Sequence, residues 1–419
     1  MDSFLVSPNG PLKGEVCISG SKNAVLPVMA AAMLANGISK ISNVPNLKDT
    51  NTMSDVLRVI GCRIKEDKDC LSIDSSDINH LEAPYELVKT MRASFYVLGP
   101  LVAKFGKCRV SLPGGCAWGP RPVDLHLKGL EALGAKINVT HGYVEALSSG
   151  RLKGNTFSFP ISSVGATANI LMAATLAEGT SVLQNSSIEP EITSLAEYLI
   201  GMGAKINGIG TRTLIIEGVE NLNAGSGQTI ADRIEAGTFL AAGAITRGKV
   251  KTTNMVPAHQ GALLEVFERI GCKITQGDDW VELDAEDREL LPAHIVTMPY
   301  PGFPTDMQAQ LMALLATVKG TSSVRDTIYN DRFKHVSELN RLGADISLKE
   351  DTALINGGGE LTGAPVMASD LRASAALVLA GLVAKKQTEI SRIYHLDRGY
   401  ENFEIKLSAL GAKLERVNG

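Results

Sequence analysis

The chain lacks long hydrophobic runs, an excess of basic charge and closely spaced cysteines. Its longest apolar run, residues 375–384, is shorter than the ~18 residues that suggest a membrane-spanning helix. A formal net charge of −4 argues against a general nucleic-acid binder, which usually presents a basic surface. We therefore expect no membrane insertion and no nucleic-acid partner. The first residues also lack the basic and apolar regions of a signal peptide.

The six cysteines show no C-x-x-C spacing and no nearby pair of histidines. This pattern argues against a zinc site and against the disulfide framework of a secreted protein, and it fits a reducing cytoplasm. Cys17, Cys62 and Cys272 each stand beside apolar neighbours in a patterned element, so we expect them to be small buried residues.

What the chain does contain is a glycine-marked repeat. A helix-like pattern that ends in Gly and leads into a short β-like stretch recurs six times. Apolar residues stand one and four positions before each Gly, as in a helix with one buried stripe. We expect each Gly to take the left-handed position that ends its helix. These glycines are 68 to 73 residues apart: Gly61, Gly134, Gly203, Gly271, Gly343 and Gly411.

Six repeats at near-constant spacing indicate internal duplication rather than chance. A chain of 419 residues also exceeds the ~250–300 residues that one hydrophobic core usually holds. We therefore predict an α/β fold with two domains of three units each. Ala-rich helix patterns alternate with the first series and end near a second set of positions: Gly37, Gly106, Gly179, Gly248, Gly320 and, in the sixth copy, Lys386 or Gln387.

The segment LPGGCAWGPRPVD, residues 112–124, places Cys116 among Gly and Pro residues with Arg121 close by. Gly114 to Gly119 imitates a phosphate-binding loop, but Pro120 and Arg121 follow where that motif requires Lys and Ser or Thr. A thiol near a fixed cation suits acid–base or nucleophilic work near neutral pH. From these residues alone, a functional Cys116 and a structural one remain equally open.

Three repeats carry a cation at the start of an apolar helix, namely Lys22, Arg92 and Arg372. Arg372 lies two residues after Asp370. A single such cation is most often an exposed charge, whereas three at equivalent points favour convergent anion binding. Thr305 and Asp306 precede another helix, where a plain N-cap is the simpler interpretation. Residues 397–399, Asp-Arg-Gly, lie between a predicted strand and a predicted helix, where a solvated turn is the simpler interpretation.

Taken together, these segments closely resemble the UDP-N-acetylglucosamine-dependent branch of the enolpyruvyl transferase family. The matching stretches follow in order along the whole chain: GEVCISGSKNAVLP, YELVKTMRAS, SLPGGCAWGPRPVDLH, SVGAT, EPEI, DRIEAGTFL, FPTDMQAQ, SDLRASAALVLAG and RIYHLDRGYE. The resemblance implies a two-domain inverse α/β barrel. One domain would comprise residues 1–21 with 230–419 and the other residues 22–229, with the active site in the cleft between them.

The resemblance also implies a reaction. Phosphoenolpyruvate and UDP-N-acetylglucosamine would give the enolpyruvyl nucleotide sugar and phosphate, the first committed step of peptidoglycan synthesis, by addition and elimination without metal or cofactor. Cys116 would protonate the enol carbon, form a covalent adduct with phosphoenolpyruvate and be alkylated by fosfomycin. Asp306 would take the proton of the 3′-hydroxyl, and Lys22 and Arg398 would complete the catalytic group.

The implied substrate-binding residues are those that hold phosphate, carboxylate, sugar and uracil: Lys22, Asn23, Arg92, Arg121, Pro122, Val123, Asp124, Leu125, Ser163, Val164, Gly165, Asp306, Ile328, Arg332, Asp370, Arg372 and Arg398. Trp118 and Ile161 depart from the family pattern in the loop and near the nucleotide phosphates. Two alternatives stay open. One is the sister transferase that acts on shikimate 3-phosphate, and the other is a catalytically silent protein that binds the nucleotide sugar.

Overall fold

The chain forms two compact units in a computed structural model, which describes residues 2–113, 123–329 and 331–417. Unit 1 comprises Met1–Ser19 with Ala231–Gly419, and unit 2 comprises Gly20–Ile230. Unit 1 therefore contains both ends of the chain, whereas unit 2 is continuous. The divisions expected at 21/22 and 229/230 differ from these by two residues and one residue.

The described residues form six four-stranded sheets, three in each unit, with one shared topology. In each sheet one outer strand runs parallel to its neighbour, and the other neighbours run antiparallel. The unit 2 sheets are ordered β14 (Ser226–Gln228)–β3 (Ile38–Ser42)–β5 (Cys70–Asp74)–β4 (Arg63–Asp67), β6 (Glu82–Ala83)–β7 (Lys107–Ser111)–β9 (Tyr143–Leu147)–β8 (Lys136–Thr140), and β10 (Thr156–Ser158)–β11 (Thr180–Gln184)–β13 (Thr213–Glu217)–β12 (Lys205–Asn207).

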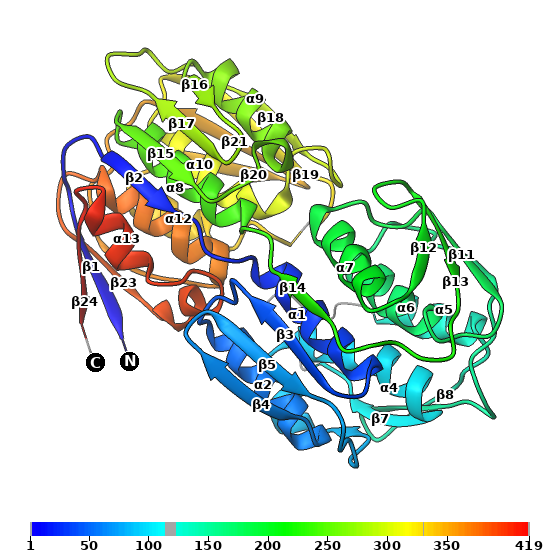
Figure 1. The fold of residues 1–419 in the computed structure, drawn as a ribbon. Coiled ribbons are helices and arrows are strands. Elements are labelled where there is room, and N and C mark those ends of the chain that lie inside the picture. The colour runs from blue at the N-terminus through cyan, green and yellow to red at the C-terminus, as the bar shows by residue number, and fades with distance from the viewer. Residues whose placement is uncertain (1, 114–122, 330, 418–419) are drawn as a thin grey trace. The chain divides into compact units, whose positions relative to one another are not determined.

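In unit 1 the first strand of the chain completes the last repeat. The third strand of the other five sheets directly follows the fourth in the chain, but in one unit 1 sheet this place is taken by β1. Figure 1 shows β1 beside β23 and β24, with both chain ends at this sheet. The unit 1 orders are β22 (Pro365–Met367)–β23 (Thr388–Ser391)–β1 (Ser3–Ser7)–β24 (Lys413–Val417), β2 (Lys13–Cys17)–β15 (Lys249–Thr253)–β17 (Trp280–Asp284)–β16 (Lys273–Gln276), and β18 (His294–Thr297)–β19 (Gly320–Asp326)–β21 (Thr352–Gly357)–β20 (Ile346–Lys349).

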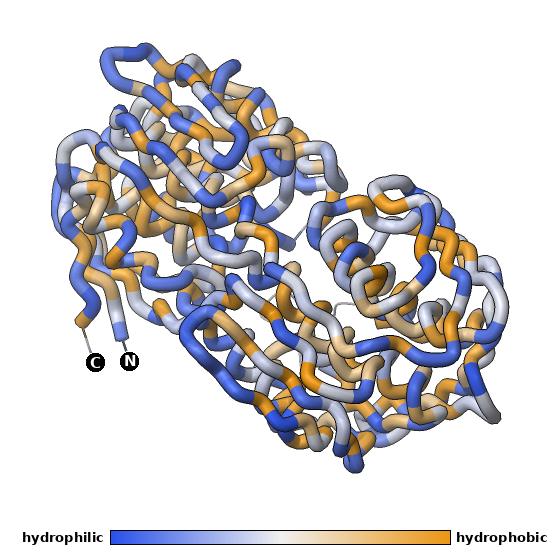
Figure 2. Tube along the Cα trace, in the orientation of Figure 1, coloured by the Kyte–Doolittle hydropathy of each residue, from blue (hydrophilic) through white to orange (hydrophobic). Residues whose placement is uncertain are grey.

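Two kinds of helix alternate in each unit, because their sequences carry different apolar patterns. Helices that are apolar on nearly every side are almost wholly buried: α1 (Lys22–Ala31), α4 (Leu98–Phe105), α6 (Val164–Ala174), α8 (Arg233–Ile245), α10 (Gln308–Ala316) and α12 (Leu371–Leu382). Helices with a single stripe bury only that face: α2 (Lys48–Ile60), α5 (Asp124–Ala132), α7 (Pro190–Gly201), α9 (Gly261–Ile270), α11 (Val336–Arg341) and α13 (Phe403–Ala409). Figure 2 shows the hydrophobic segments gathered inside each unit.

Short elements connect these layers and carry several of the expected site residues. They are α3 (Tyr85–Val88) and the 3₁₀ turns η1 (Ala32–Leu34), η2 (Arg92–Val97), η3 (Pro257–Gln260), η4 (Thr305–Met307) and η5 (Ile393–Arg398). Among the described residues, no helix is long and apolar enough to cross a membrane.

The glycine series behaves as predicted. All six glycines of the first series have positive φ, from 91° at Gly134 to 114° at Gly61, and each ends or follows a single-stripe helix. The prediction for Cys62 and Cys272 is confirmed, since both are buried, but that for Cys17 is wrong. Cys17 ends the edge strand β2, where Val16 points to the core and alternation turns Cys17 outward.

Candidate active site

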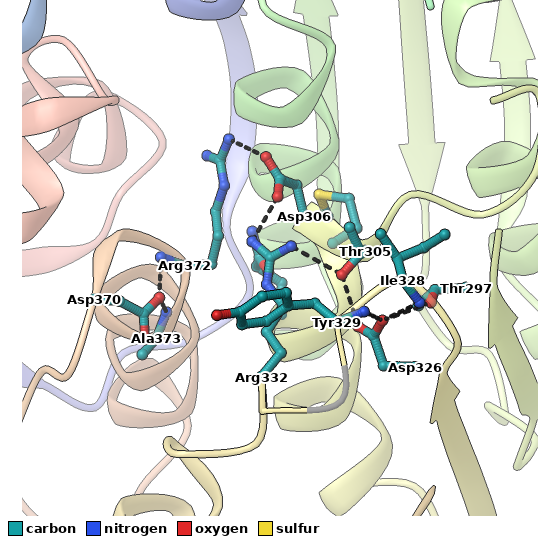
Figure 3. Close-up of polar contacts among 12 residues, drawn as sticks. Thr297, Thr305, Asp306, Asp326, Ile328, Tyr329, Arg332, Asp370, Arg372 and Ala373 are labelled. Carbon is teal, nitrogen blue, oxygen red and sulfur yellow. Dashed lines mark hydrogen bonds and ion pairs between the residues drawn. The ribbon is translucent and has the colours of Figure 1, made fainter. Parts of the chain in front are cut away.

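The most elaborate polar cluster in unit 1 centres on Asp306, which lies in η4 just before the buried helix α10. Figure 3 shows two arginines directed at its carboxylate. Arg332 donates a hydrogen bond to Oδ1 of Asp306, and Arg372 donates to Oδ2 at 2.9 Å. Both arginine side chains are less than 10% exposed, whereas that of Asp306 is 27% exposed. Of these three side chains, that of Asp306 is therefore the most exposed.

The two guanidinium groups determine the ionisation of Asp306. Burial by itself would raise the pKa of this carboxyl group, but the charges of Arg332 and Arg372 outweigh it and hold the pKa well below its usual range. Burial likewise opposes the charge of Arg372, and Asp306 overcomes it, so the pKa of Arg372 is raised. The two arginines therefore favour the ionised form of Asp306.

Thr305 and Asp326 extend the cluster. No sequence pattern predicted a role for Asp326, which is the last residue of β19. Thr305 Oγ1 accepts a hydrogen bond from Arg332 at 2.8 Å and donates to Asp326 at 2.6 Å. The other oxygen of buried Asp326 accepts from the backbone N–H groups of Ile328 and Tyr329 at 3.0 and 2.9 Å. Asp326 thereby fixes the loop that carries Ile328, an expected site residue whose side chain is 43% exposed.

Asp370 and Arg372 have separate tasks at the start of α12. Asp370 is the N-cap, because its Oδ1 accepts from the N–H groups of Arg372 and Ala373 at 2.9 and 3.0 Å. This cap fixes the first turn, from which the Arg372 side chain reaches Asp306. The buried Nη1 of Arg372 has no hydrogen-bond partner among the described residues. A buried guanidinium with an unused donor is well suited to an anion that arrives with the substrate.

Arg398 ends η5, and its neighbour Asp397 is held firmly in place. Arg416 donates to both oxygens of Asp397, at 2.7 and 3.1 Å, and Glu404 accepts from the same guanidinium at 2.7 Å. The alternative of a loosely solvated turn is therefore wrong for Asp397. Arg398 is half-buried and directly follows the anchored Asp397.

In unit 2, Lys22 opens α1 as the sequence predicts, but it does not stand alone. Its Nζ lies 3.4 Å from Asp49 Oδ2, with the two side chains 14% and 4% exposed. The first turn of α1 contains no acidic residue, so Asp49 reaches Lys22 from the start of α2. Asn23 follows Lys22 and is half-buried. The sequence pattern found the cation and missed the carboxylate that orients it.

The other expected residues of unit 2 gather around the start of α6. Ser163 is its N-cap, with Oγ accepting from Ala166 N–H at 3.3 Å, and Val164 and Gly165 form the first turn. Arg92 opens η2. Burial, and after it the positive charge of Arg92, lowers the pKa of His126, a residue that lies beside Gly165. Asp124 begins α5, two residues before His126. Val123 caps α5, and Leu125 packs against the unit 2 core. Sequence reasoning named most of this group and missed His126.

Three expected site residues, Cys116, Arg121 and Pro122, lie outside the described residues, as does Trp118. Their roles stay predictions. Ile161 is 73% exposed and lies two positions before the α6 cap.

Comparison with known proteins identifies the family. Residues 6–407 match the EPSP synthase family, described as 3-phosphoshikimate 1-carboxyvinyltransferase. The UDP-N-acetylglucosamine 1-carboxyvinyltransferase of Chlorobaculum parvum is 54% identical over 99% of this chain and 98% of its own. The enzyme of the same name from Acinetobacter baylyi is 52% identical over the full length of both chains. This chain belongs to the UDP-N-acetylglucosamine 1-carboxyvinyltransferases.

Solved structures agree on the fold. The enolpyruvyl transferase NikO from Streptomyces tendae has a TM-score of 0.89 at 25% identity, covering 100% of this chain and 99% of its own. EPSP synthase from Acinetobacter baumannii has a TM-score of 0.78 at 19% identity over the full length of both chains. The enolpyruvyl transferase fold that the resemblance implied is therefore confirmed. The family assignment favours the nucleotide-sugar enzyme over its shikimate 3-phosphate relative.

Proposed function

We propose that the chain transfers the enolpyruvyl group of phosphoenolpyruvate to the 3′-hydroxyl of UDP-N-acetylglucosamine and releases phosphate. The family carries this proposal, and the Asp306 cluster supports it, because the chemistry needs a carboxylate acceptor among fixed cations. The enolpyruvyl nucleotide sugar would enter peptidoglycan synthesis. Both substrates are cytoplasmic metabolites, so we place the reaction in the cytoplasm.

The proposed reaction has two steps. In the addition, the 3′-oxygen bonds to C2 of phosphoenolpyruvate, its proton passes to Asp306, and C3 gains a proton from Cys116. In the elimination, C3 gives a proton to the Cys116 thiolate, the C2–O bond to phosphate breaks, the departing phosphate takes the proton held by Asp306, and the enol double bond re-forms. Atoms and charge balance with no other reactant. Cys116 can also add to C2 through sulfur, which stores phosphoenolpyruvate as a covalent adduct.

The low pKa of Asp306 restricts how it works as a base. A carboxylate paired with two arginines is a weak proton acceptor, so it cannot remove the hydroxyl proton before the new C–O bond begins to form. Once the oxygen bonds to C2 its proton becomes strongly acidic, and Asp306 can accept it then. Before that, the ionised carboxylate accepts a hydrogen bond that orients the hydroxyl group.

Cations in both units match the charges of the substrates. In unit 1, Arg332, Arg372 and Arg398 provide forked donors for phosphate and carboxylate groups. In unit 2, Lys22 is fixed by Asp49 as a point charge for phosphoenolpyruvate. We assign contacts with the sugar and uracil ends to Asn23, Asp306 and Ile328. We assign contacts with the diphosphate and uridine to the remaining group: Arg92, Arg121, Pro122, Val123, Asp124, Leu125, Ser163, Val164 and Gly165. Asp370 acts by fixing Arg372.

The test is phosphate release from phosphoenolpyruvate by the purified chain. We expect release with UDP-N-acetylglucosamine and none with shikimate 3-phosphate or without an acceptor. Turnover with shikimate 3-phosphate would establish the sister activity instead. Binding of the nucleotide sugar without any phosphate release would establish the silent binding protein.

A further inference from the structure

His126 is a buried polar side chain that none of the assignments above uses. It lies among the unit 2 residues, around the start of α6, that we propose bind the nucleotide sugar. It lies in the first turn of α5 and is 5% exposed. Its Nε2 faces the start of α6: a Cβ atom placed on Gly165 would lie 3.2 Å from Nε2 and 3.3 Å from Cε1. Glycine at position 165 therefore leaves room for the imidazole to reach the first turn of α6.

The hydrogen bonds of Asn169 fix which nitrogen of His126 carries the proton. Asn169 Oδ1 accepts from the N–H of Gly99 at 2.6 Å, which turns the amide nitrogen the other way. That nitrogen donates to the carbonyl oxygen of Phe95 at 2.9 Å and to Nδ1 of His126 at 3.0 Å. Because Nδ1 accepts, the proton of the neutral ring is on Nε2.

The surroundings keep this ring neutral. Burial lowers the pKa of His126 to about 3, and the positive charge of Arg92 adds to the effect, while Asp124 opposes it. The other titratable groups nearby are Tyr96 of η2, whose hydroxyl would lie 4.0 Å from the same Cβ position, and Glu191 of α7, which interacts with Tyr96. Nε2 is thus an uncharged N–H donor. Among the described residues, no hydrogen-bond partner of Nε2 occurs.

The place that Nε2 faces is suited to an anion. Helix α6 has 11 residues, its first turn contains no acidic side chain, and its first backbone N–H groups have no partner within the helix. Ser163 uses its hydroxyl on Ala166, which leaves the N–H groups of Val164 and Gly165 for a ligand. A buried donor aimed at this turn adds a directed hydrogen bond to the helix dipole.

We propose that His126 is a further substrate-binding residue, whose Nε2–H donates a hydrogen bond to a diphosphate oxygen of the nucleotide sugar at the start of α6. This assignment rests on the proposed function, since it concerns the same substrate. A neutral donor binds the diphosphate without the free-energy cost of burying another charge beside Arg92. It also makes this contact independent of pH in the range where an ordinary histidine titrates.

Two substitutions separate the donor from the packing. In His126→Asn, the side-chain oxygen can replace Nδ1 as acceptor for Asn169, but nothing replaces Nε2–H. In His126→Gln, the amide nitrogen reaches the position of Nε2 and keeps the donor. We expect His126→Asn to weaken binding of UDP-N-acetylglucosamine about tenfold and His126→Gln to stay within about threefold of the unchanged chain, measured by calorimetry on the full chain.

Two controls accompany this measurement. The KM for phosphoenolpyruvate should change less than about twofold in both variants, whereas a merely structural role would lower the melting temperature without a selective loss of nucleotide-sugar affinity. The dissociation constant of the unchanged chain should be level from pH 5.5 to 8. Tighter binding as the pH falls through about 6.5, seen only when His126 is present, would overturn the neutral-donor assignment.

The outcomes also distinguish this inference from the proposed function. Equal binding by the unchanged chain, His126→Asn and His126→Gln would overturn the role of His126 and leave the reaction standing. Suppose that only His126→Asn loses affinity for the nucleotide sugar, and that the unchanged chain releases no phosphate. These results would support the role of His126 and overturn the proposed reaction. Failure of the unchanged chain to bind the nucleotide sugar would overturn both.

Discussion

Asp306 is the residue whose environment says most about the chemistry. Two buried guanidinium groups hold its carboxylate ionised, while 27% of its side chain remains exposed to an incoming hydroxyl group. The same arrangement that lowers its basicity fixes its orientation. A carboxylate of this kind contributes to the rate only in step with bond formation at the substrate.

We expect Asp306→Asn to lower kcat by about 10²- to 10³-fold, because the amide keeps the shape and cannot accept the proton. The matched control is Thr305→Val, which removes a hydroxyl bonded to Arg332 and Asp326 while the carboxylate stays. It should raise KM more than it lowers kcat. Steady-state kinetics over a range of substrate concentrations, with melting curves to verify folding, would decide. An Asn variant that keeps more than about a tenth of kcat would contradict the base assignment.

At the scale of the element, the repeat depends on glycines that end the single-stripe helices. Gly134 has a φ of 91°, and a Cβ there would meet no atom within 4 Å. Its requirement is therefore purely one of backbone conformation. Gly201 differs, since it is the last helical residue of α7, has no positive φ and also has open space around its missing Cβ.

This pair permits a matched comparison. We expect Gly134→Ala to lower the free energy of unfolding by about 1–2 kcal/mol, because an L-residue is strained in the left-handed region. Gly201→Ala should raise it by up to about 1 kcal/mol, since Ala is the better helix former. Denaturant unfolding of both variants measures the difference. If both substitutions change stability in the same direction and by the same amount, the conformational argument for the glycine series fails.

The sequence predicted these helices and their terminal glycines because both depend on local periodicity. A helix stripe and its terminal glycine depend on neighbours within one or two turns, so the six units could be recognised directly. The partners of site residues could not. Asp49 reaches Lys22 from another helix, and Asn169 fixes His126 from 43 residues away in the chain. Only the packing of α1 against α2 and of α5 against α6 brings such groups together.

At the scale of the whole molecule, the chain passes twice between the units, and a buried ion pair anchors the first passage on the unit 1 side. Glu235 accepts from the N–H of Ser19 at 2.9 Å and from Lys406 Nζ at 2.6 Å. Lys406 also donates to Ser19 Oγ at 2.6 Å, and that hydroxyl donates to Glu401 at 2.6 Å. Burial raises the pKa of Glu235 to about 7, with Lys406 opposing the rise and Asp232 adding to it.

A raised carboxyl pKa makes stability fall as the pH rises. Between the ordinary value near 4.5 and about 7, the folded chain holds a proton that the unfolded chain has released. The stabilisation is therefore complete below the unfolded pKa and is lost as the pH rises through 7. Relative to the unchanged chain, we expect Glu235→Gln to gain about 1–3 kcal/mol of unfolding free energy between pH 5 and pH 8.

Unfolding curves at several pH values, followed by fluorescence of Trp280 in unit 1, measure this difference. Glu360→Gln is the control, because Glu360 is an exposed partner of Lys385 and should show no such trend. A pH-independent difference between Glu235→Gln and the unchanged chain would refute the raised pKa.

The sequence by itself determined the six repeats, their helix-ending glycines and the cations at the starts of helices, because each is written in local spacing. The tertiary structure decided which charges meet. Asp306, Arg332 and Arg372 come from η4, the loop after β19 and the start of α12, and only the packing of neighbouring repeats places them within hydrogen-bond distance. The place of β1 in the last sheet is decided in the same way, since strand pairing depends on the whole unit and not on the seven residues at the start of the chain.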